Sequence, residues 1–260
     1  MNETGTPTPS GSMRISDETR RAALRKLNRR ATPLGMIWQW VQTFAIAVIV
    51  FFFLRAFVIE AFKIPSGSME STLMPGDFLL VDKLVYGVDV PFTPLHIPGW
   101  RSPVRGDVIV FQYPLEPTKT YVKRLVGVPG DTLSMREGTL FRNGVKVDEP
   151  YVVHSDSGGD PSNEQFRWQR TYMVRTAEAA AFSDRPTRNN WGPLVVPAGK
   201  YFALGDNRDN SEDSRYWGFV PSENVRGRPI VIYYSYAPDS TSAYGWLPGV
   251  RWQRLGARVR

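Results

Sequence analysis

The sequence predicts a mainly β body tethered to a membrane by one N-terminal transmembrane helix, and three observations support this architecture. One long apolar run occupies Ile37–Val58, and no second run of that length follows it. After it, short apolar runs alternate with turn residues, and 21 prolines leave little room for long helices. The charge is concentrated at the ends, because residues 1–35 carry +4, the last ten residues +4 and residues 36–250 only −1. Such a body is not expected to bind nucleic acid, whose readers carry a basic stripe on the folded domain.

The apolar run Ile37–Val58 is long enough to cross a bilayer. As a helix it would measure roughly 33 Å, against a hydrocarbon core of about 30 Å. Trp38 and Trp40 suit an interfacial belt, and Arg55 can extend its guanidinium to the opposite interface. A buried helix of a soluble domain and a cleaved signal peptide are the alternatives. The length of the run and of the tail before it favours an uncleaved anchor over residues 36–58.

The basic residues of the N-terminal tail predict the orientation of this anchor. All seven Lys and Arg of residues 1–35 precede the span. The positive-inside rule therefore places residues 1–35 in the cytoplasm and everything after residue 58 outside. Residues 1–12 are small and polar and are expected to be disordered. Residues 16–30 are either a short basic helix on anionic lipid or a solvated charge run.

Short apolar runs predict the strands of the body. Asn143-Gly144 is a strong hairpin signal, and Glu137-Gly138 indicates another turn just before it. The polar stretch Ser155–Asn190 is expected to be an irregular excursion with a short helix at Thr176–Phe182. The expected strands are Phe78–Val81, Val108–Tyr113, Tyr121–Val128, Thr132–Met135, Thr139–Arg142, Tyr201–Leu204 and Pro229–Tyr234.

Composition narrows the possible chemistry. The chain has no cysteine, which excludes a disulfide framework, a thiolate metal site and a cysteine nucleophile. Its two histidines, His96 and His154, make a multi-histidine zinc site improbable, and we expect both to be exposed or locally hydrogen-bonded. The acidic loop of residues 205–215 fails as a calcium loop because Arg208 occupies a ligand position. We therefore expect no metal and no cofactor.

Two remaining features could supply a nucleophile and a base. Ser68 lies on a Ser-Gly turn that can present its hydroxyl outward, although most such turns are only turns. A hydroxyl needs a base at neutral pH, and a buried lysine of lowered pKa can serve. Lys123 lies mid-strand in an apolar run, on the face of Tyr121 and Leu125, while Arg124 points to the other face. An exposed strand lysine is the alternative.

At these residues the sequence resembles bacterial type I signal peptidases, membrane-bound serine–lysine proteases that cleave signal peptides from exported proteins. Four blocks carry the resemblance in order. They are PSGSM at 65–69 followed by Leu73 and the GD at 76–77, RGDVIVF at 105–111, YVKRLVGVPGD at 121–131, and GDNRDNSEDSRYWGFVP at 205–221. Lysine rather than histidine at 123 indicates the bacterial or organellar branch of the family.

The resemblance implies a role for each polar residue in these blocks. Ser68 would be the nucleophile and Lys123 the general base. The Ser66 hydroxyl and the Ser68 backbone N–H would form the oxyanion hole, and Ser211 would hydrogen-bond the lysine amine. Asp213 would pair with Arg215 and brace the loop.

The resemblance also implies how a substrate binds. A signal peptide would lie extended beside residues 62–66 by β-augmentation, with small side chains in shallow apolar pockets. The pockets would be lined by Phe62, Ile64, Pro65, Met69, Leu73, Val110, Tyr121 and Val122.

By the same resemblance, antiparallel sheets form a catalytic core from residues 59–131 and 200–236, with a small excursion at 84–103. Residues 132–199 would be an inserted β-rich region, and 237–260 a basic C-terminal tail. Trp246 and Trp252 with the arginines of that tail either meet the outer membrane interface or form a frayed end.

The implied location is the plasma membrane of a bacterium, in a single pass with the catalytic domain on the outer face. The implied partners are signal peptides, the bilayer and the secretion translocon. Two departures from the family are Ser71, where many relatives have proline, and the single span. A peptidase dedicated to one secretion or pilus substrate, and a non-catalytic anchored binding module, are the alternative functions.

Overall fold

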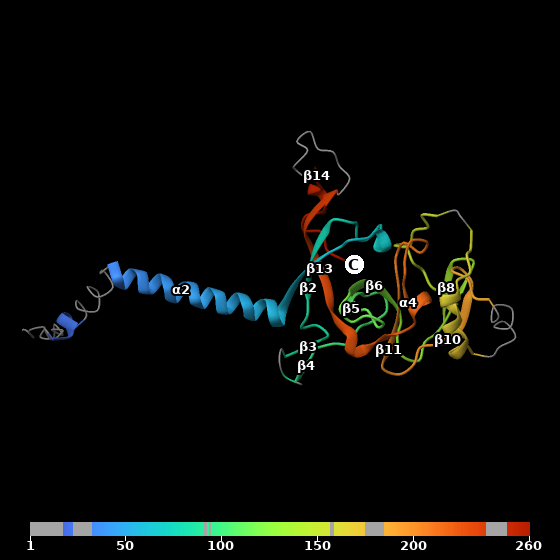
Figure 1. Cartoon of the computed structure of the whole chain (residues 1–260), viewed down its shortest axis with the longest axis horizontal. Coiled ribbons are helices and arrows are strands. Elements are labelled where there is room, and N and C mark those ends of the chain that lie inside the picture. The colour runs from blue at the N-terminus through green and yellow to red at the C-terminus, as the bar shows by residue number, and fades with distance from the viewer. Residues whose placement is uncertain are drawn as a thin grey trace, which may run out of the picture. The chain divides into compact units, whose positions relative to one another are not determined.

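The computed structural model divides into two compact units, Met1–Phe53 and Leu54–Arg260 (Figure 1). It describes residues 18–22, 33–90, 93, 95–156, 159–174, 185–237 and 249–260. The segment predicted to be disordered, most of the predicted basic helix, the helix predicted at Thr176–Phe182 and Trp246 lie outside these residues.

The predicted membrane span is helical throughout. Helix α2 covers Pro33–Phe53 and continues as a π-helical turn, η1, over Leu54–Val58. Together they form a stretch of 26 residues that contains an 18-residue window with a mean hydropathy of 2.2, and no residue of α2 is buried. Pro33 occupies the first turn, where its missing N–H removes no helical hydrogen bond. Within the described residues, this is the one helix long and apolar enough to cross a membrane.

The body is mainly β, as predicted, and its larger sheet has eight antiparallel strands. Their order is β1-β2-β13-β5-β6-β11-β12, with β14 paired to β13. The central strand, β13, is 13 residues long and pairs with both β2 and β5 across several bulges, which curl the sheet. The strands are β1 Ile59–Lys63, β2 Asp77–Asp82, β5 Val108–Gln112, β6 Thr120–Gly127, β11 Lys200–Leu204, β12 Val220–Pro221, β13 Val225–Ala237 and β14 Gly249–Val250.

Two smaller sheets complete the body. One has the order β10-β7-β8-β9, formed by β10 Trp191–Val195, β7 Thr132–Arg136, β8 Thr139–Arg142 and β9 Val145–Lys146. The other is a hairpin of β3 Gly87–Asp89 and β4 His96–Pro98 within the predicted small excursion. The short helices are η2 Gly67–Met69, η3 Glu164–Thr171, α4 Ser214–Trp217, η4 Ser222–Asn224 and η5 Trp252–Arg254.

Both predicted turns of the smaller sheet are confirmed. Asn143 and Gly144 join β8 to β9 with φ of 53° and 79°, and Glu137 and Gly138 join β7 to β8 with φ of 48° and 74°. Two successive positive φ values match the right-handed twist of the strands they connect. All seven predicted strands are present, with ends displaced by a few residues. The strands β1, β3, β4, β10, β12 and β14 were not predicted as such, and β9 was indicated only by the hairpin signal at Asn143-Gly144.

The core holds the two larger sheets in one unit. A buried cluster joins Leu133, Met135 and Trp191 of the smaller sheet to Phe202 and Leu204 of β11. The segment expected as an insertion therefore packs on the larger sheet. A second cluster holds η2 against β2, β5 and β13. Its members are Ile64, Met69, Leu73, Leu79, Val81, Val108, Val110, Val122, Ile232 and Val259.

The C-terminal residues return to the larger sheet. Ile232 N–H donates to Ala257 O at 2.9 Å, Gly256 N–H donates to Ile232 O at 2.8 Å, and Val259 is buried. Arg254 forms an ion pair with the buried Asp77 at 2.6 Å. The alternative of a frayed tail is therefore wrong for residues 249–260. The Arg254 guanidinium is paired within the body and is not free to meet a membrane. Trp252 is exposed.

We predict that Arg254→Ala lowers the free energy of unfolding by about 3 kcal/mol, because it leaves the Asp77 carboxylate buried without its cation. Burial alone would raise the pKa of Asp77, but hydrogen bonds from Arg254, Met74 and Ser235 hold it below its ordinary value. The stabilisation is therefore present above about pH 4 and lost as the pH falls further. Denaturant unfolding of the full chain in detergent measures the change. The exposed Arg258→Ala is the control, and equal stability of the two variants would contradict the prediction.

Candidate active site

Ser68 lies on the 3₁₀ turn η2, directly after β1. Ile64 N–H donates to Asp77 O at 2.8 Å and Gly76 N–H donates to Ile64 O at 2.9 Å, so β2 holds the end of β1 in place. Pro65 cannot donate to a sheet ladder and helps to end the strand. Met69 and Leu73 are fully buried below the turn, which leaves Ser68 above the core.

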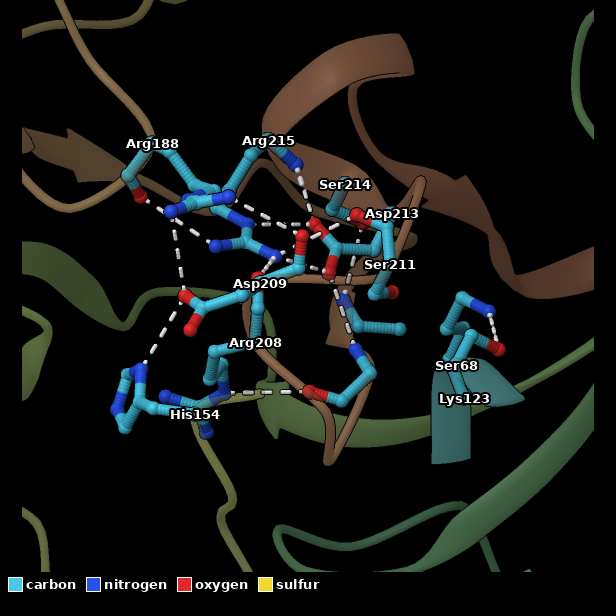
Figure 2. Close-up of polar contacts among 12 residues, drawn as sticks. Ser68, Lys123, His154, Arg188, Arg208, Asp209, Ser211, Asp213, Ser214 and Arg215 are labelled. Atoms are coloured by element: carbon cyan, nitrogen blue, oxygen red, sulfur yellow. Dashed lines mark hydrogen bonds and ion pairs between the residues drawn. The ribbon is translucent and has the colours of Figure 1, made fainter. Parts of the chain in front are cut away.

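Lys123 approaches this turn from β6. The lysine is opposite Ile109 of β5 and is only 5% exposed, and its Nζ lies 2.7 Å from Ser68 Oγ. Figure 2 shows the two side chains meeting apart from the polar network of the neighbouring loop. The two residues predicted to carry nucleophile and base are thus in direct hydrogen-bond contact.

Burial changes the protonation of this lysine. It lowers the pKa of Lys123 to about 8, although the negative charges of Asp213 and Glu212 act in the opposite direction. Lys123 makes no ion pair within the described residues, so no carboxylate contact offsets its desolvation. An amine with this pKa has a substantial neutral fraction near pH 8, and only the neutral form can accept a proton.

The loop of residues 205–215 is built around a buried ion pair. Arg215 donates from Nε and Nη2 to the two carboxylate oxygens of Asp213, both at 2.8 Å, and both residues are fully buried (Figure 2). Asp213 also accepts from Gly205 N–H and caps α4 by accepting from Arg215 N–H. The predicted pairing of Asp213 with Arg215 is confirmed, and it fixes the backbone of the loop.

This loop contacts the Ser68 turn directly. Asn207 N–H donates to Ser68 O at 3.2 Å. A Cβ at Gly205 would overlap both Ser68 O and the side chain of Ser211, so the loop can approach this closely only with glycine there. Arg124 on the other face of β6 pairs with Asp206, whose carboxylate also accepts from Thr72 Oγ1 at 2.6 Å.

The turn after Ser68 contains Ser71, one of the two departures that the resemblance implies. Ser71 has φ of 83°, which a proline ring cannot adopt, and its Oγ donates to Tyr151 O at 2.7 Å. In this chain a hydrogen bond, rather than a ring, fixes the position.

One predicted contact of the dyad is not formed. Ser211 Oγ is buried without a hydrogen-bond partner, so the hydrogen bond expected between Ser211 and Lys123 is absent. The Ser66 side chain makes no capping hydrogen bond, and the residue lines the cavity described below. The orienting role of Ser211 and the oxyanion role of Ser66 remain predictions.

A cavity of about 400 Å³ opens at the dyad. Six of the eight predicted pocket residues line it, but Leu73 and Val110 do not. Leu73 is fully buried in the core below the turn, and Val110 faces a different cavity beside Glu60 and Arg226. Sequence reasoning missed Thr120, Asn210 and Glu212. The lining residues are Phe62, Ile64, Pro65, Ser66, Ser68, Met69, Thr120, Tyr121, Val122, Lys123, Asn210 and Glu212.

The histidines lie outside this cavity and pair locally, as predicted. His96 Nδ1 is 2.8 Å from Asp89 Oδ1, and His154 Nδ1 is 3.2 Å from Asp209 Oδ1. Among the residues that the structure describes, no group of three or more His, Asp or Glu side chains could hold a metal ion.

Comparison with known proteins identifies the family of this chain. The family model described as signal peptidase, peptidase S26, matches residues 37–234. A signal peptidase I from Pseudomonas aeruginosa is 38% identical over 231 residues, covering 84% of this chain and 78% of the relative. A signal peptidase I from Aquifex aeolicus is 34% identical, covering 76% of this chain and 84% of the relative. One from Haemophilus influenzae is 31% identical, covering 88% and 77%. The chain therefore belongs to the signal peptidase family S26.

Proposed function

We propose that this protein is a membrane-anchored serine endopeptidase that removes signal peptides from exported preproteins, with Ser68 as nucleophile and Lys123 as general base. The observation that carries the proposal is the 2.7 Å contact between Lys123 Nζ and Ser68 Oγ at the wall of a cavity. Because the amine is buried and its pKa lowered, it can accept the hydroxyl proton that the reaction must remove.

Acylation uses the dyad as follows. The neutral amine of Lys123 accepts the proton of Ser68 as Oγ attacks the scissile carbonyl carbon. The Ser68 N–H and the Ser66 hydroxyl donate to the oxyanion, and each such donor is typically worth about 3 kcal/mol in the transition state. The resulting ammonium then gives its proton to the leaving amine, which restores the neutral base and leaves an acyl ester on Ser68.

Deacylation repeats the proton transfers with water. Lys123 accepts a proton from water as the water oxygen attacks the ester carbonyl, and then returns the proton to Ser68 Oγ as the ester bond breaks. The signal peptide departs with a new carboxyl terminus.

The substrate is an extended segment bound at the edge of the larger sheet. β1 is the terminal strand of that sheet and pairs only with β2 among the described strands, so its other edge can pair with a peptide. The side chains of Ile64, Met69 and Val122 give the cavity apolar walls. Walls of this kind favour small apolar side chains next to the cut.

The anchor brings the site to the membrane surface. Residues 1–35 lie in the cytoplasm and the body lies on the outer face of a bacterial plasma membrane, by the distribution of basic residues around the span. Ser68 follows Val58, the last helical residue, by ten positions. Besides the substrate, the proposed partners are the bilayer and the translocon that delivers preproteins. The exposed Trp252 is a side chain that can contact the bilayer.

We predict that Ser68→Ala and Lys123→Arg each reduce the cleavage of a preprotein at least about 10³-fold, because removing one member of a nucleophile–base pair leaves only residual catalysis. A guanidinium cannot serve as the base, since it does not deprotonate in proteins. The control is Lys119→Arg, an exposed lysine four residues away in sequence that is paired with Glu116. Full cleavage by Lys123→Arg would reject the base assignment, and full cleavage by Ser68→Ala would reject Ser68 as the nucleophile. A wild-type chain that cleaves no preprotein would favour a non-catalytic module.

We predict that Lys123→Met stabilises the fold while abolishing cleavage. A fall in pKa from 10.5 to about 8 corresponds to about 3 kcal/mol of destabilisation by the buried ammonium. The folded pKa lies below the unfolded one, so this penalty is complete below about pH 8 and disappears as the pH rises to about 10.5. Denaturant unfolding at pH 7 and pH 10.5 measures it. A variant less stable than wild type at pH 7 would contradict the assignment.

We predict that kcat/KM rises with pH through a limb centred near pH 8, because only the neutral amine of Lys123 is active. Below that pH the rate falls about tenfold for each unit. The measurement is the pH profile on a peptide without titratable side chains near the cut. A profile that is flat between about pH 6 and 9 would exclude this lysine as the base.

We predict that single introduced cysteines will report the body outside the membrane and the N-terminal tail inside. The sequence contains no cysteine, so the labelling has no background signal. A membrane-impermeant maleimide on intact spheroplasts should label Lys146→Cys, an exposed residue of the body. It should label Ser10→Cys only after lysis. The reverse pattern would place the body in the cytoplasm.

A further inference from the structure

Glu212 lines the cavity but takes no part in the chemistry described above. It and Lys123 are the two charged residues among those that line the cavity. Glu212 is exposed and forms no ion pair or hydrogen bond with any residue that the structure describes. When Lys123 is neutral, the Glu212 carboxylate is therefore the remaining charge that faces a bound substrate.

The loop fixes the position of Glu212. Asn210 and Glu212 are exposed and line the cavity, whereas the neighbouring Ser211 and Asp213 are buried and do not line it. Asp213, the residue after Glu212, is held by its ion pair with Arg215, which Figure 2 shows. The Glu212 carboxylate thus projects from a braced backbone, and little ordering is needed when a substrate binds.

The cavity wall that includes Glu212 also includes Tyr121, whose ring stacks on that of Tyr113. The two ring centroids are 4.6 Å apart. Burial raises the pKa of both tyrosines, and the charge of Glu212 is the next largest cause. A bound peptide would displace water from this wall, and charges interact more strongly when water is displaced.

We propose that Glu212 is a specificity-determining residue that selects substrates by the charge of the segment flanking the scissile bond. A basic side chain in that segment is attracted to Glu212, and an acidic one is repelled. Discrimination of this kind works through the penalty on the wrong charge as much as through attraction of the right one. The inference rests on the proposed function and adds a charge preference to the small apolar side chains that the pockets accept.

The test compares peptides that differ only in carrying Lys, Gln or Glu at one position, scanned over the positions on both sides of the cut. The quantity is the ratio of kcat/KM for the Lys peptide to that for the Glu peptide. We expect the wild-type ratio to exceed 1 at the position nearest Glu212. The Glu212→Gln variant should lower it by about two- to tenfold, the range expected for a partly exposed charge pair. The Glu212→Lys variant should bring it below 1.

Two controls distinguish a charge effect from a structural one. Glu164→Gln removes an exposed carboxylate of η3 that is paired with Arg167 and does not line the cavity, and it should leave the ratio unchanged. Raising the salt concentration to about 1 M should reduce the wild-type ratio, because exposed charges are screened at that ionic strength. A general loss of activity in a variant does not change the ratio, because both kcat/KM values are measured on the same variant.

The outcomes separate this inference from the proposed function. If Glu212→Gln keeps the wild-type ratio at every scanned position, or if salt does not change the wild-type ratio, Glu212 has no selective role although the enzyme still cleaves. Cleavage of the Gln peptide by Ser68→Ala would instead overturn the proposed function.

Discussion

The structure depends on the burial of one lysine amine within hydrogen-bond distance of one serine hydroxyl. An ammonium at this position loses its water and gains no contacting carboxylate, so the pKa of Lys123 falls to about 8 through desolvation. Ser68 and Lys123 are 55 residues apart in the sequence, and the contact requires η2 to be seated on the core and β6 to be in register with β5. An error of one residue in that register would turn Lys123 to the other face of the sheet.

The loop of residues 205–215 maintains this arrangement from the side. Its Asp213–Arg215 pair is fully buried, which is stabilising only because the remaining donors and acceptors are satisfied by Gly205, Arg208 and neighbouring backbone. Because Gly205 lies close against the Ser68 carbonyl, the rigid loop also restrains the Ser68 turn. Ser211 also lies in this loop, and its buried Oγ has no hydrogen-bond partner. The hydrogen bond predicted from Ser211 to Lys123 is therefore absent.

The sequence predicted the features that local patterns determine. The span, the seven strands and the turns at Asn143-Gly144 and Glu137-Gly138 follow from apolar periodicity and positive-φ residues. The dyad residues were predicted mainly from the family resemblance, because a serine on a turn and a lysine in a strand are ambiguous alone. The predictions that failed, such as Leu73 and Val110 as pocket residues, concerned tertiary packing. Whether Leu73 faces a cavity or the core depends on which strands pass beneath η2, and no local pattern contains that information.

The same limit explains the other differences. β1 and β10 are short, and their sequences show no clear alternation of polar and apolar residues. They become strands only by pairing with β2 and β7. The arginines of the C-terminal segment looked like a free basic tail in the sequence. Arg254 is instead required by Asp77, a carboxylate 177 residues away that is fully buried. Long-range compensation of a buried charge is not visible in a linear charge count.

Strand β6 shows how burial and pairing together determine what a cation can do. Lys123 and Arg124 are adjacent and both are almost fully buried, at 5% and 2% exposed. Arg124 faces Asp206 and makes two hydrogen bonds to its carboxylate, so its charge is compensated and it holds the loop to the sheet. Lys123 faces the cavity, where no carboxylate touches it, and its charge is destabilised. Strand alternation thus separates a structural cation from a reactive amine within two consecutive residues. Exchanging the two residue types would place a permanent guanidinium charge beside Ser68 and remove the bidentate contact with Asp206.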